Sequence, residues 1–174
     1  MPRLCLVRHT TPLIDQDRPA EEWGVGAEGR AQVESILPTL EEIGPTIIVT
    51  SPEPKARITA EILAQGTGLN LRIDDDLREQ GLGAVPWYGG HDEFHSMVRE
   101  HFALPEMTIL GNESSRAAAM RFNRVVQGFA ATEVPVLVSH GRIMSAWLAS
   151  QIALDAFDIW QNLQMPDALL VDIA

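Results

Sequence analysis

Two stretches decide how this chain folds: Leu4-Cys5-Leu6-Val7-Arg8-His9 and Val136-Leu137-Val138-Ser139-His140-Gly141. Each is a short apolar run that ends abruptly in a histidine. An apolar run of this length between polar residues is typical of a buried strand, and ligands of parallel α/β sheets gather at the carboxyl ends of the strands. We therefore expect His9 and His140 to share one site.

A third segment has the same design. Ile47-Ile48-Val49 runs into Thr50-Ser51-Pro52, where the serine is suited to cap a helix and the proline to occupy its first position. Lys55 would lie in the first turn of that helix, and it is the only lysine among 13 basic residues, the rest being arginines. The side chains expected at this sheet edge supply cationic donors and a nucleophile, the equipment for handling a phosphoryl group: Arg8, His9, Lys55 and His140.

The remaining periodicity alternates helices with strands. Further strands are expected at 69–73 and 168–171, and helices at 27–43, after Pro52, from 112 to 129, and after His140. Pro38 is expected to kink or split the first of these helices. This alternation predicts a three-layer α/β/α sandwich with a mostly parallel central sheet, in a single domain.

Composition narrows the function classes. The chain has 174 residues and a formal net charge of −11, which disfavours binding to nucleic acid or to an anionic membrane. No apolar stretch approaches the ~20 residues that cross a bilayer, and the first strand begins too early for a signal peptide, so we expect a cytoplasmic protein. The lone Cys5 excludes an internal disulfide. A phosphate site in this acidic chain would be a local positive pocket for a small phosphorylated substrate.

Four segments, in this order along the chain, resemble motifs of one known family. Arg8-His9-Thr10 resembles an Arg-His-Gly signature, and residues 51–60 resemble a Ser-Pro-Leu-x-Arg-Ala-x-x-Thr-Ala segment. Leu77-Arg78-Glu79, with Gly81 and Gly83 nearby, looks like the segment that carries a general acid, and Ser139-His140-Gly141 matches a second-histidine motif. These are motifs of the histidine phosphatase superfamily, the phosphoglycerate-mutase-like group.

The resemblance implies a role for each matching residue. His9 would be the nucleophile that forms a phosphohistidine, and Glu79 would protonate the leaving group and then activate water. Arg8, Lys55 and His140 would bind the phosphate oxygens. The family's scheme uses no metal and no cofactor. Residues from about 81 to 110, the least regular part by composition, would form a short cap over the pocket.

The sequence departs from the family pattern at three places. Lys55, rather than Arg57, stands where the family usually has its second phosphate-binding arginine, so the charge is kept and the bidentate fork is lost. Thr10 stands where glycine is commonest. Asp15 lies about where some members of the family place a phosphate-binding asparagine. Because the side chain of Asp15 is itself an anion, we do not assign phosphate binding to it.

These features predict a metal-independent phosphomonoesterase that acts on a small phosphorylated metabolite. A phosphomutase with the same intermediate, a phosphoprotein phosphatase, and a phosphate-ester-binding regulatory module with little turnover stay open. His91, His95 and His101 are not expected to hold a metal, because no further well-spaced ligand supports them. Arg121 is expected to be a structural ion-pair partner. The sequence leaves open the roles of Trp87 and Tyr88 and the oligomeric state, a homo-oligomer included.

Overall fold

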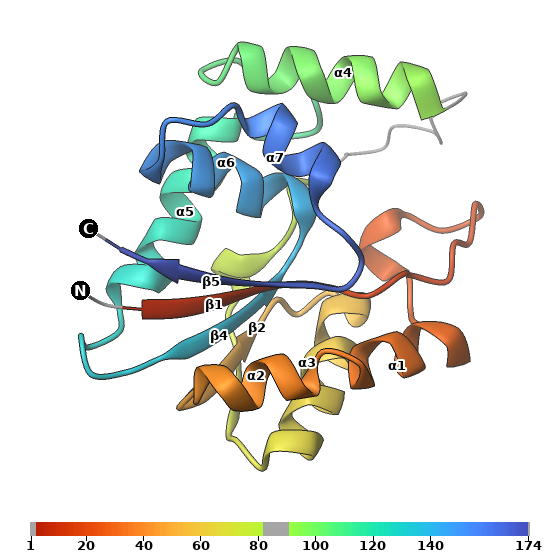
Figure 1. The fold of residues 1–174 in the computed structure, drawn as a ribbon. Coiled ribbons are helices and arrows are strands. Elements are labelled where there is room, and N and C mark those ends of the chain that lie inside the picture. Colours follow the sequence, from red (N-terminus) through yellow and green to blue (C-terminus); the bar gives the residue numbers. More distant parts are fainter. Residues whose placement is uncertain (1–2, 82–90, 174) are drawn as a thin grey trace.

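A computed structural model describes residues 3–81 and 91–173 of the chain (Figure 1). Its centre is a five-stranded sheet in the order β3-β2-β4-β1-β5. The strands are β1 (Arg3–Arg8), β2 (Ile47–Thr50), β3 (Leu71–Ile73), β4 (Pro135–Ser139) and β5 (Asp167–Asp172). The first four run parallel, and β5 pairs antiparallel with β1 at one edge. The predicted mostly parallel sheet is therefore confirmed.

The register of the central strands aligns their carboxyl ends. Arg8 of β1 lies opposite Ser139 of β4, and Thr50 of β2 lies opposite Val138. The backbone N–H of His9 continues the ladder by donating to the carbonyl of Ser139 at 3.0 Å. The residue that follows each strand consequently emerges at the same edge of the sheet.

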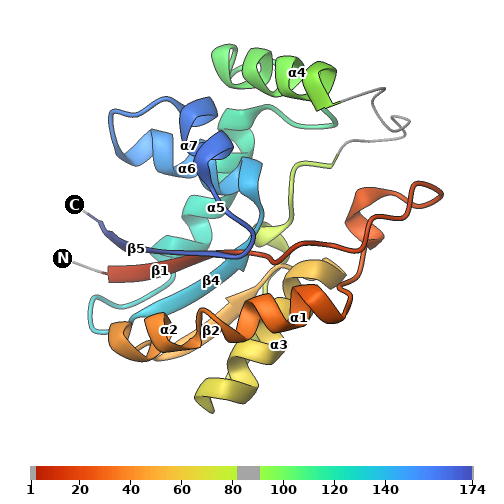
Figure 2. The same ribbon diagram turned by 45° about the vertical axis from the view of Figure 1, so that its right-hand side comes forward.

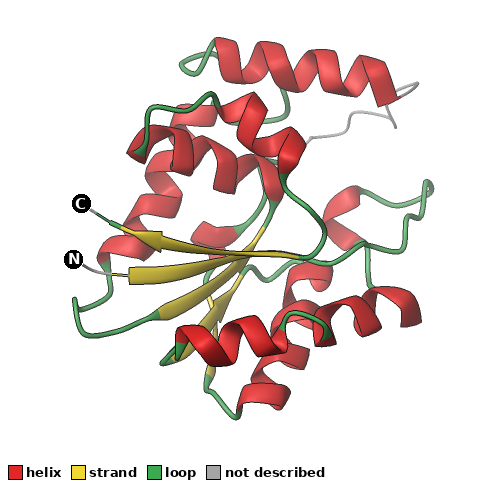
Figure 3. Ribbon diagram, viewed as in Figure 1, coloured by secondary structure: helices red, strands yellow, loops and turns green. Residues whose placement is uncertain are grey.

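Helices cover both faces of the sheet (Figures 2 and 3). Each face has its own apolar core. Alternate residues of a strand point to opposite faces, so Leu4 and Leu6 pack in one core while Cys5 and Val7 pack in the other. Three helices cover the second core: α1 (Ala27–Glu34), α2 (Leu37–Ile43) and α3 (Pro54–Thr67). The first core lies under α5 (Ser115–Gln127), α6 (Gly141–Gln151) and α7 (Ala156–Asn162), with α4 (His91–Ala103) packed outside α7. This confirms the three-layer sandwich.

Prolines and caps set the helix boundaries. Pro38 falls in the first turn of α2, and the predicted long helix is split into α1 and α2 before it. Helix α3 begins later than the sequence suggested: Pro54 is its first residue and Glu53 its N-cap, instead of Pro52 and Ser51. Ser51 still serves the turn, since its hydroxyl accepts from the backbone N–H of Glu53 at 3.2 Å.

Further elements differ from the expectations. The stretch expected to be the least regular contains α4, a helix of 13 residues, while residues 82–90 of that stretch lie outside the described part. The short helices η1 (Ala20–Glu22) and η2 (Asp75–Leu77) border the carboxyl edge of the sheet.

Within residues 3–81 and 91–173, none of the helices combines the length and the hydropathy that a membrane crossing requires.

Candidate active site

The two histidines that end β1 and β4 meet at the carboxyl edge of the sheet. The ring centroids of His9 and His140 are 5.1 Å apart, at an interplanar angle of 61°. His9 is 6% exposed and His140 is fully buried. Parallel pairing of adjacent strands accounts for this arrangement, because it delivers the residue after each strand to one edge.

The backbone fixes which nitrogen of His9 can react. Its Nδ1 lies 2.7 Å from the carbonyl oxygen of Thr10, an acceptor, so Nδ1 carries the proton and Nε2 keeps its lone pair. Burial lowers the pKa of His9 well below its ordinary value, and the charges of His140 and Lys55 add to the effect. His9 is therefore a neutral imidazole with a nucleophilic Nε2 at physiological pH.

His140 occupies the N-cap position of α6. Its Nε2 lies 2.8 Å from the hydroxyl of Ser51, and its Nδ1 is buried with no hydrogen-bond partner among the described residues. Burial and then the charge of Lys55 lower the pKa of His140 well below its ordinary value. A buried ring nitrogen without a partner is costly in a folded protein unless a ligand or water satisfies it.

Arg8 lies beside the first turn of α6. Its Nη1 donates to the carbonyl of Leu163 at 2.6 Å, while its Nε is buried without a partner in the described chain. Gly141 makes room for the guanidinium, because a Cβ at that position would lie 3.1 Å from Arg8 Cζ. The Ser-His-Gly sequence thus has a steric reason for its glycine.

Lys55 lies inside the site, and Arg57 lies outside it. Lys55 is 5% exposed, and its ammonium donates to the carbonyl of Ala20 at 2.7 Å and to Glu53 Oε2 at 2.6 Å. Arg57 is exposed and pairs with Glu61 at 3.4 Å. An ammonium has three hydrogens, so one remains for a phosphoryl oxygen.

Glu79 is bound to the start of α6. Its Oε1 accepts from the backbone N–H of Ile143 at 3.1 Å and its Oε2 from that of Arg142 at 3.0 Å. Burial alone would raise the pKa of Glu79, but the charge of Arg142 and the backbone donors of Gln80 and Arg142 outweigh it and hold the pKa below its ordinary value. Glu79 is therefore ionised in the unliganded site. That state suits a base that activates water, and the carboxylate must gain a proton before it can act as an acid.

Glu53 belongs to this site and was not predicted from the sequence, and the same holds for Arg142 beside Glu79. The side chain of Glu53 is 3% exposed, and its Oε1 accepts from the backbone N–H of Glu79 at 2.8 Å. The same oxygen lies 3.5 Å from His140 Nε2. A signal was present, because the carboxylate stands where the family segment has leucine, two residues before the lone lysine.

A cavity of about 390 Å³ adjoins the carboxylates of Glu53 and Glu79. Its other lining residues come from η1, η2 and the segments around α5: Glu21, Asp75, Arg78, Gly81, Asn112, Glu113 and Arg121. Arg121 forms an ion pair with Glu113 and donates to the carbonyl of Asp76 at 2.7 Å, which confirms the predicted ion-pair partner. The position beside Glu79 suits the leaving group of an ester.

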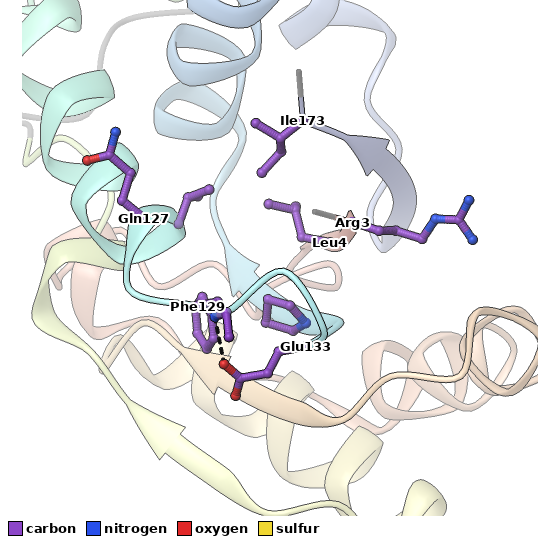
Figure 4. Close-up of a pocket in the computed structure, with 9 residues that line it drawn as sticks. Arg3, Leu4, Gln127, Phe129, Glu133 and Ile173 are labelled. Carbon is purple, nitrogen blue, oxygen red and sulfur yellow. Dashed lines mark hydrogen bonds between the residues drawn. The ribbon is translucent and has the colours of Figure 1, made fainter. Parts of the chain in front are cut away.

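A second, smaller cavity of about 110 Å³ lies at the opposite edge of the sheet (Figure 4). Leu4, Phe129 and Ile173 line it, and Glu133 closes one side by accepting from the backbone N–H of Ala130 at 2.8 Å. Because Arg3 and Pro135 begin their strands, this cavity lies at the amino ends of β1 and β4. It is therefore remote from the histidines.

The other residues considered from the sequence lie away from the pair His9 and His140 or outside the described residues. Asp15 is half exposed and pairs with Arg18 at 3.5 Å. The His95 ring packs at 4.7 Å from that of Trp160, and His101 is buried with Nε2 2.7 Å from the Gln80 amide. Among the described residues, no group of three side chains is arranged to hold a metal ion. Trp87, Tyr88 and Gly83 lie outside the described residues.

Comparisons with known proteins agree with the fold. A "Probable phosphoglycerate mutase GpmB" of Escherichia coli (strain K12 / DH10B) is 26% identical over 169 residues, which cover 90% of this chain and 78% of that protein. The structure of a mycobacterial glucosyl-3-phosphoglycerate phosphatase superposes with a TM-score of 0.78 at 22% identity, covering 99% of this chain and 90% of the other. For phosphoserine phosphatase from Entamoeba histolytica the TM-score is 0.75 at 16% identity, covering 98% and 90%. These two structures share the fold.

The family match itself extends over nearly the whole chain. Residues 4–172 match the family described as "Histidine phosphatase superfamily (branch 1)". The matched range contains His9, Lys55, Glu79 and His140. The chain belongs to the histidine phosphatase superfamily.

Proposed function

We propose that this protein is a metal-independent phosphomonoesterase that hydrolyses a small phosphorylated metabolite through a phosphohistidine at His9. One observation carries the proposal: His9 presents an unprotonated Nε2 because its Nδ1 is held by the Thr10 carbonyl. A binding site for phosphate would need donors there. A lone pair on a buried, neutral imidazole is instead what attack on phosphorus requires.

The residues around His9 supply what the transition state needs. Arg8, the third hydrogen of Lys55, and His140 Nδ1 are donors for the three non-bridging oxygens. Preorganised donors in a buried site stabilise developing charge more strongly than water does. In this scheme the cationic side chains perform the charge stabilisation that a metal ion performs in other phosphoryl-transfer enzymes.

Two steps follow from the geometry. In the first, His9 Nε2 forms a bond to phosphorus, the P–O ester bond breaks, and the leaving oxygen takes a proton delivered by Glu79. In the second, water attacks the phosphohistidine, Glu79 accepts the proton of the water, and phosphate leaves with His9 neutral again. The ionised carboxylate at the start of α6 is ready for the second step.

The test is release of phosphate from an aryl phosphate in the presence of EDTA. Wild-type protein should turn over and carry acid-labile phosphate, and His9→Ala should lose both. Metal-dependent turnover, or turnover that survives His9→Ala, would refute the scheme. A panel of phosphorylated metabolites tested in the same way would narrow the substrate.

A phosphomutase is the second candidate, favoured by the name of the Escherichia coli relative, a probable phosphoglycerate mutase. Both activities share the phosphohistidine and differ in the acceptor of the phosphoryl group. Incubation with a labelled phosphoester and an excess of an unlabelled hydroxyl acceptor separates them. Label in inorganic phosphate indicates the phosphatase, and label in the acceptor indicates the mutase.

A further inference from the structure

The carboxylate of Glu53 touches three components of the proposed phosphoryl site. Oε2 accepts from Lys55 Nζ at 2.6 Å, and Oε1 accepts from the backbone N–H of Glu79 at 2.8 Å. Oε1 is also 3.5 Å from His140 Nε2. A carboxylate in an anion-binding site repels the ligand, so its presence there needs a reason. Glu53 is 3% exposed and therefore belongs to the interior of the site.

Pairing with Glu53 changes what Lys55 offers to a ligand. The two side chains are 6% and 3% exposed and lie in direct contact. Charges held this close in a poorly solvated place cancel each other for a third charge nearby. Lys55 can therefore donate one hydrogen bond to a phosphoryl oxygen, yet it adds little net positive charge.

Most of the cations around the site are paired with carboxylates. The charged and titratable groups come from every surrounding element: Arg8 and His9 at the end of β1, Glu21 on η1, Glu53 and Lys55 at the start of α3, Glu79 after η2, Arg121 on α5, His140 and Arg142 at the start of α6, and Asp167 on β5. Arg142 is engaged by Glu79 at 3.6 Å, and Arg121 by Glu113. Among these cations, and within the described chain, Arg8 is the one that no carboxylate contacts directly, since its hydrogen bond goes to the carbonyl of Leu163 and Glu79 and Asp167 act on it only through space.

We infer that Glu53, by cancelling the charge of Lys55, makes this site selective for the singly charged form of a phosphoryl group. The inference rests on the proposed function, because it concerns the same phosphoryl site. A phosphomonoester loses its second proton with a pKa of about 6. The dianion would leave one negative charge uncompensated among buried groups, whereas the monoanion matches the single cation, Arg8, that has no direct carboxylate partner.

The proton of the monoanion also balances the first chemical step. Glu79 is ionised in the unliganded site and needs a proton to act as an acid. The bound ester gives its proton to Glu79, which passes it to the leaving oxygen as the P–O bond breaks and the bond from His9 Nε2 to phosphorus forms. The products are the neutral alcohol and the phosphohistidine, so the step needs no proton from solvent.

The experiment compares two tetrahedral anions by calorimetric titration from about pH 5.5 to about pH 8. Inorganic phosphate gains a proton within this range, and sulfate stays a dianion. For the wild type, the affinity for phosphate should fall by up to about tenfold per pH unit above the second pKa of phosphate, while sulfate binds weakly at every pH. If a histidine took up the proton instead, the affinity for sulfate would rise in parallel as the pH falls, and that result would overturn the inference.

The Glu53→Gln variant removes the charge and keeps an oxygen for the backbone N–H of Glu79. It should bind sulfate about tenfold or more tightly than the wild type does, and its phosphate affinity should lose most of its pH dependence. Glu21→Gln is the matched control, because this exposed carboxylate borders the same cavity without contacting Lys55. It should change either affinity by less than about twofold. An unchanged pH slope in Glu53→Gln would contradict the inference.

The wild-type comparison of phosphate with sulfate tests the anion selectivity even if Glu53→Gln does not fold, and a wild type that does not discriminate between the two anions overturns the inference. The experiment measures equilibrium binding, so it is independent of turnover. A protein that discriminates between the two anions as expected but releases no phosphate from esters would refute the proposed phosphatase and leave the anion selectivity standing. Turnover without the discrimination would do the reverse.

Discussion

The guanidinium of Arg8 occupies the space beside Gly141 where a side chain would begin: a Cβ built on Gly141 would lie 3.1 Å from Cζ and Nε of Arg8 and 3.2 Å from its Nη2. This arrangement joins the end of β1 to the first residue of α6. Since Arg8 is held on its other side by the Leu163 carbonyl, the guanidinium has little room to yield. The orientation of the proposed phosphate-binding arginine therefore depends on a glycine far away in the sequence.

Gly141→Ala should lower kcat/KM by about tenfold to a hundredfold, because displacement of Arg8 weakens a charge-assisted contact to the phosphoryl group. The fold should persist, since alanine favours a helix by about 1 kcal/mol over glycine. Steady-state kinetics and a thermal melt on the same sample measure both effects. Gly24→Ala is the control, as its added Cβ meets nothing within 4 Å. Equal losses in the two variants would rule out the steric explanation.

Lys55→Arg should lower the rate, even though arginine is the usual residue of the family. The lysine is buried and fitted between Ala20 and Glu53, and a larger guanidinium overpacks that space and forms a forked pair with the carboxylate. We expect a loss of about tenfold in kcat/KM on an aryl phosphate. Arg57→Lys, on the exposed side of α3, should leave kcat/KM unchanged. A large gain in rate for Lys55→Arg would mean that the lysine weakens the site, and it would favour the low-turnover binding module.

Glu79→Gln should affect alkyl esters far more than aryl esters. Protonation of the leaving oxygen contributes about a hundredfold to ten-thousandfold to the rate when that oxygen is a poor leaving group. An aryl oxide leaves without help, so its formation of the phosphohistidine should be nearly unaffected. Single-turnover rates on one alkyl and one aryl phosphate separate the two cases. The same loss for both esters would indicate that Glu79 only positions the start of α6.

His101 should make the protein less stable in acid. Burial and the charge of Arg142 lower the pKa of His101 to about 4, against an ordinary value of 6.5. Below pH 6.5 the unfolded chain binds a proton that the folded chain does not, so the free energy of unfolding falls as the pH drops from 6.5 toward 4, by roughly 3 kcal/mol for this residue. Urea denaturation at several pH values measures it, and His101→Gln should lose less stability over that window. Parallel pH profiles for the two proteins would contradict the assignment.

Much of the fold could be predicted from local pattern. The apolar runs that become β1, β2 and β4 are short and bounded by polar residues, and Pro38 marks the division between α1 and α2. Helix α7 was not predicted, although its signals are present: Asp155 caps it by accepting from two backbone N–H groups, and Phe157 and Trp160 share its buried face. Helix α4 was obscured by the Gly- and Pro-rich composition that precedes it, although Phe94, Val98 and Phe102 recur at helical spacing.

The candidate site also has a part that the sequence predicts and a part that it does not. His9 and His140 could be brought together from sequence because parallel strands deliver both to one edge of the sheet. The contacts of Glu79 with the start of α6, and of Glu53 with Lys55 and Glu79, depend on how separate elements pack. No periodicity within one segment encodes a distance between segments. The ionised state of Glu79 and the pairing of the Lys55 charge with that of Glu53 therefore could not be predicted without the structure.

The most direct test of the account is the position of the phosphoryl group on the enzyme. A rapid quench into base during turnover, followed by digestion and tandem mass spectrometry under conditions that preserve phosphohistidine, identifies the residue, and comparison with the two phosphohistidine isomers identifies the nitrogen. The account predicts phosphorylation of His9 on Nε2, because the Thr10 carbonyl holds the proton on Nδ1. A phosphoryl group on Nδ1 of His9, on His140, or on no histidine would contradict it.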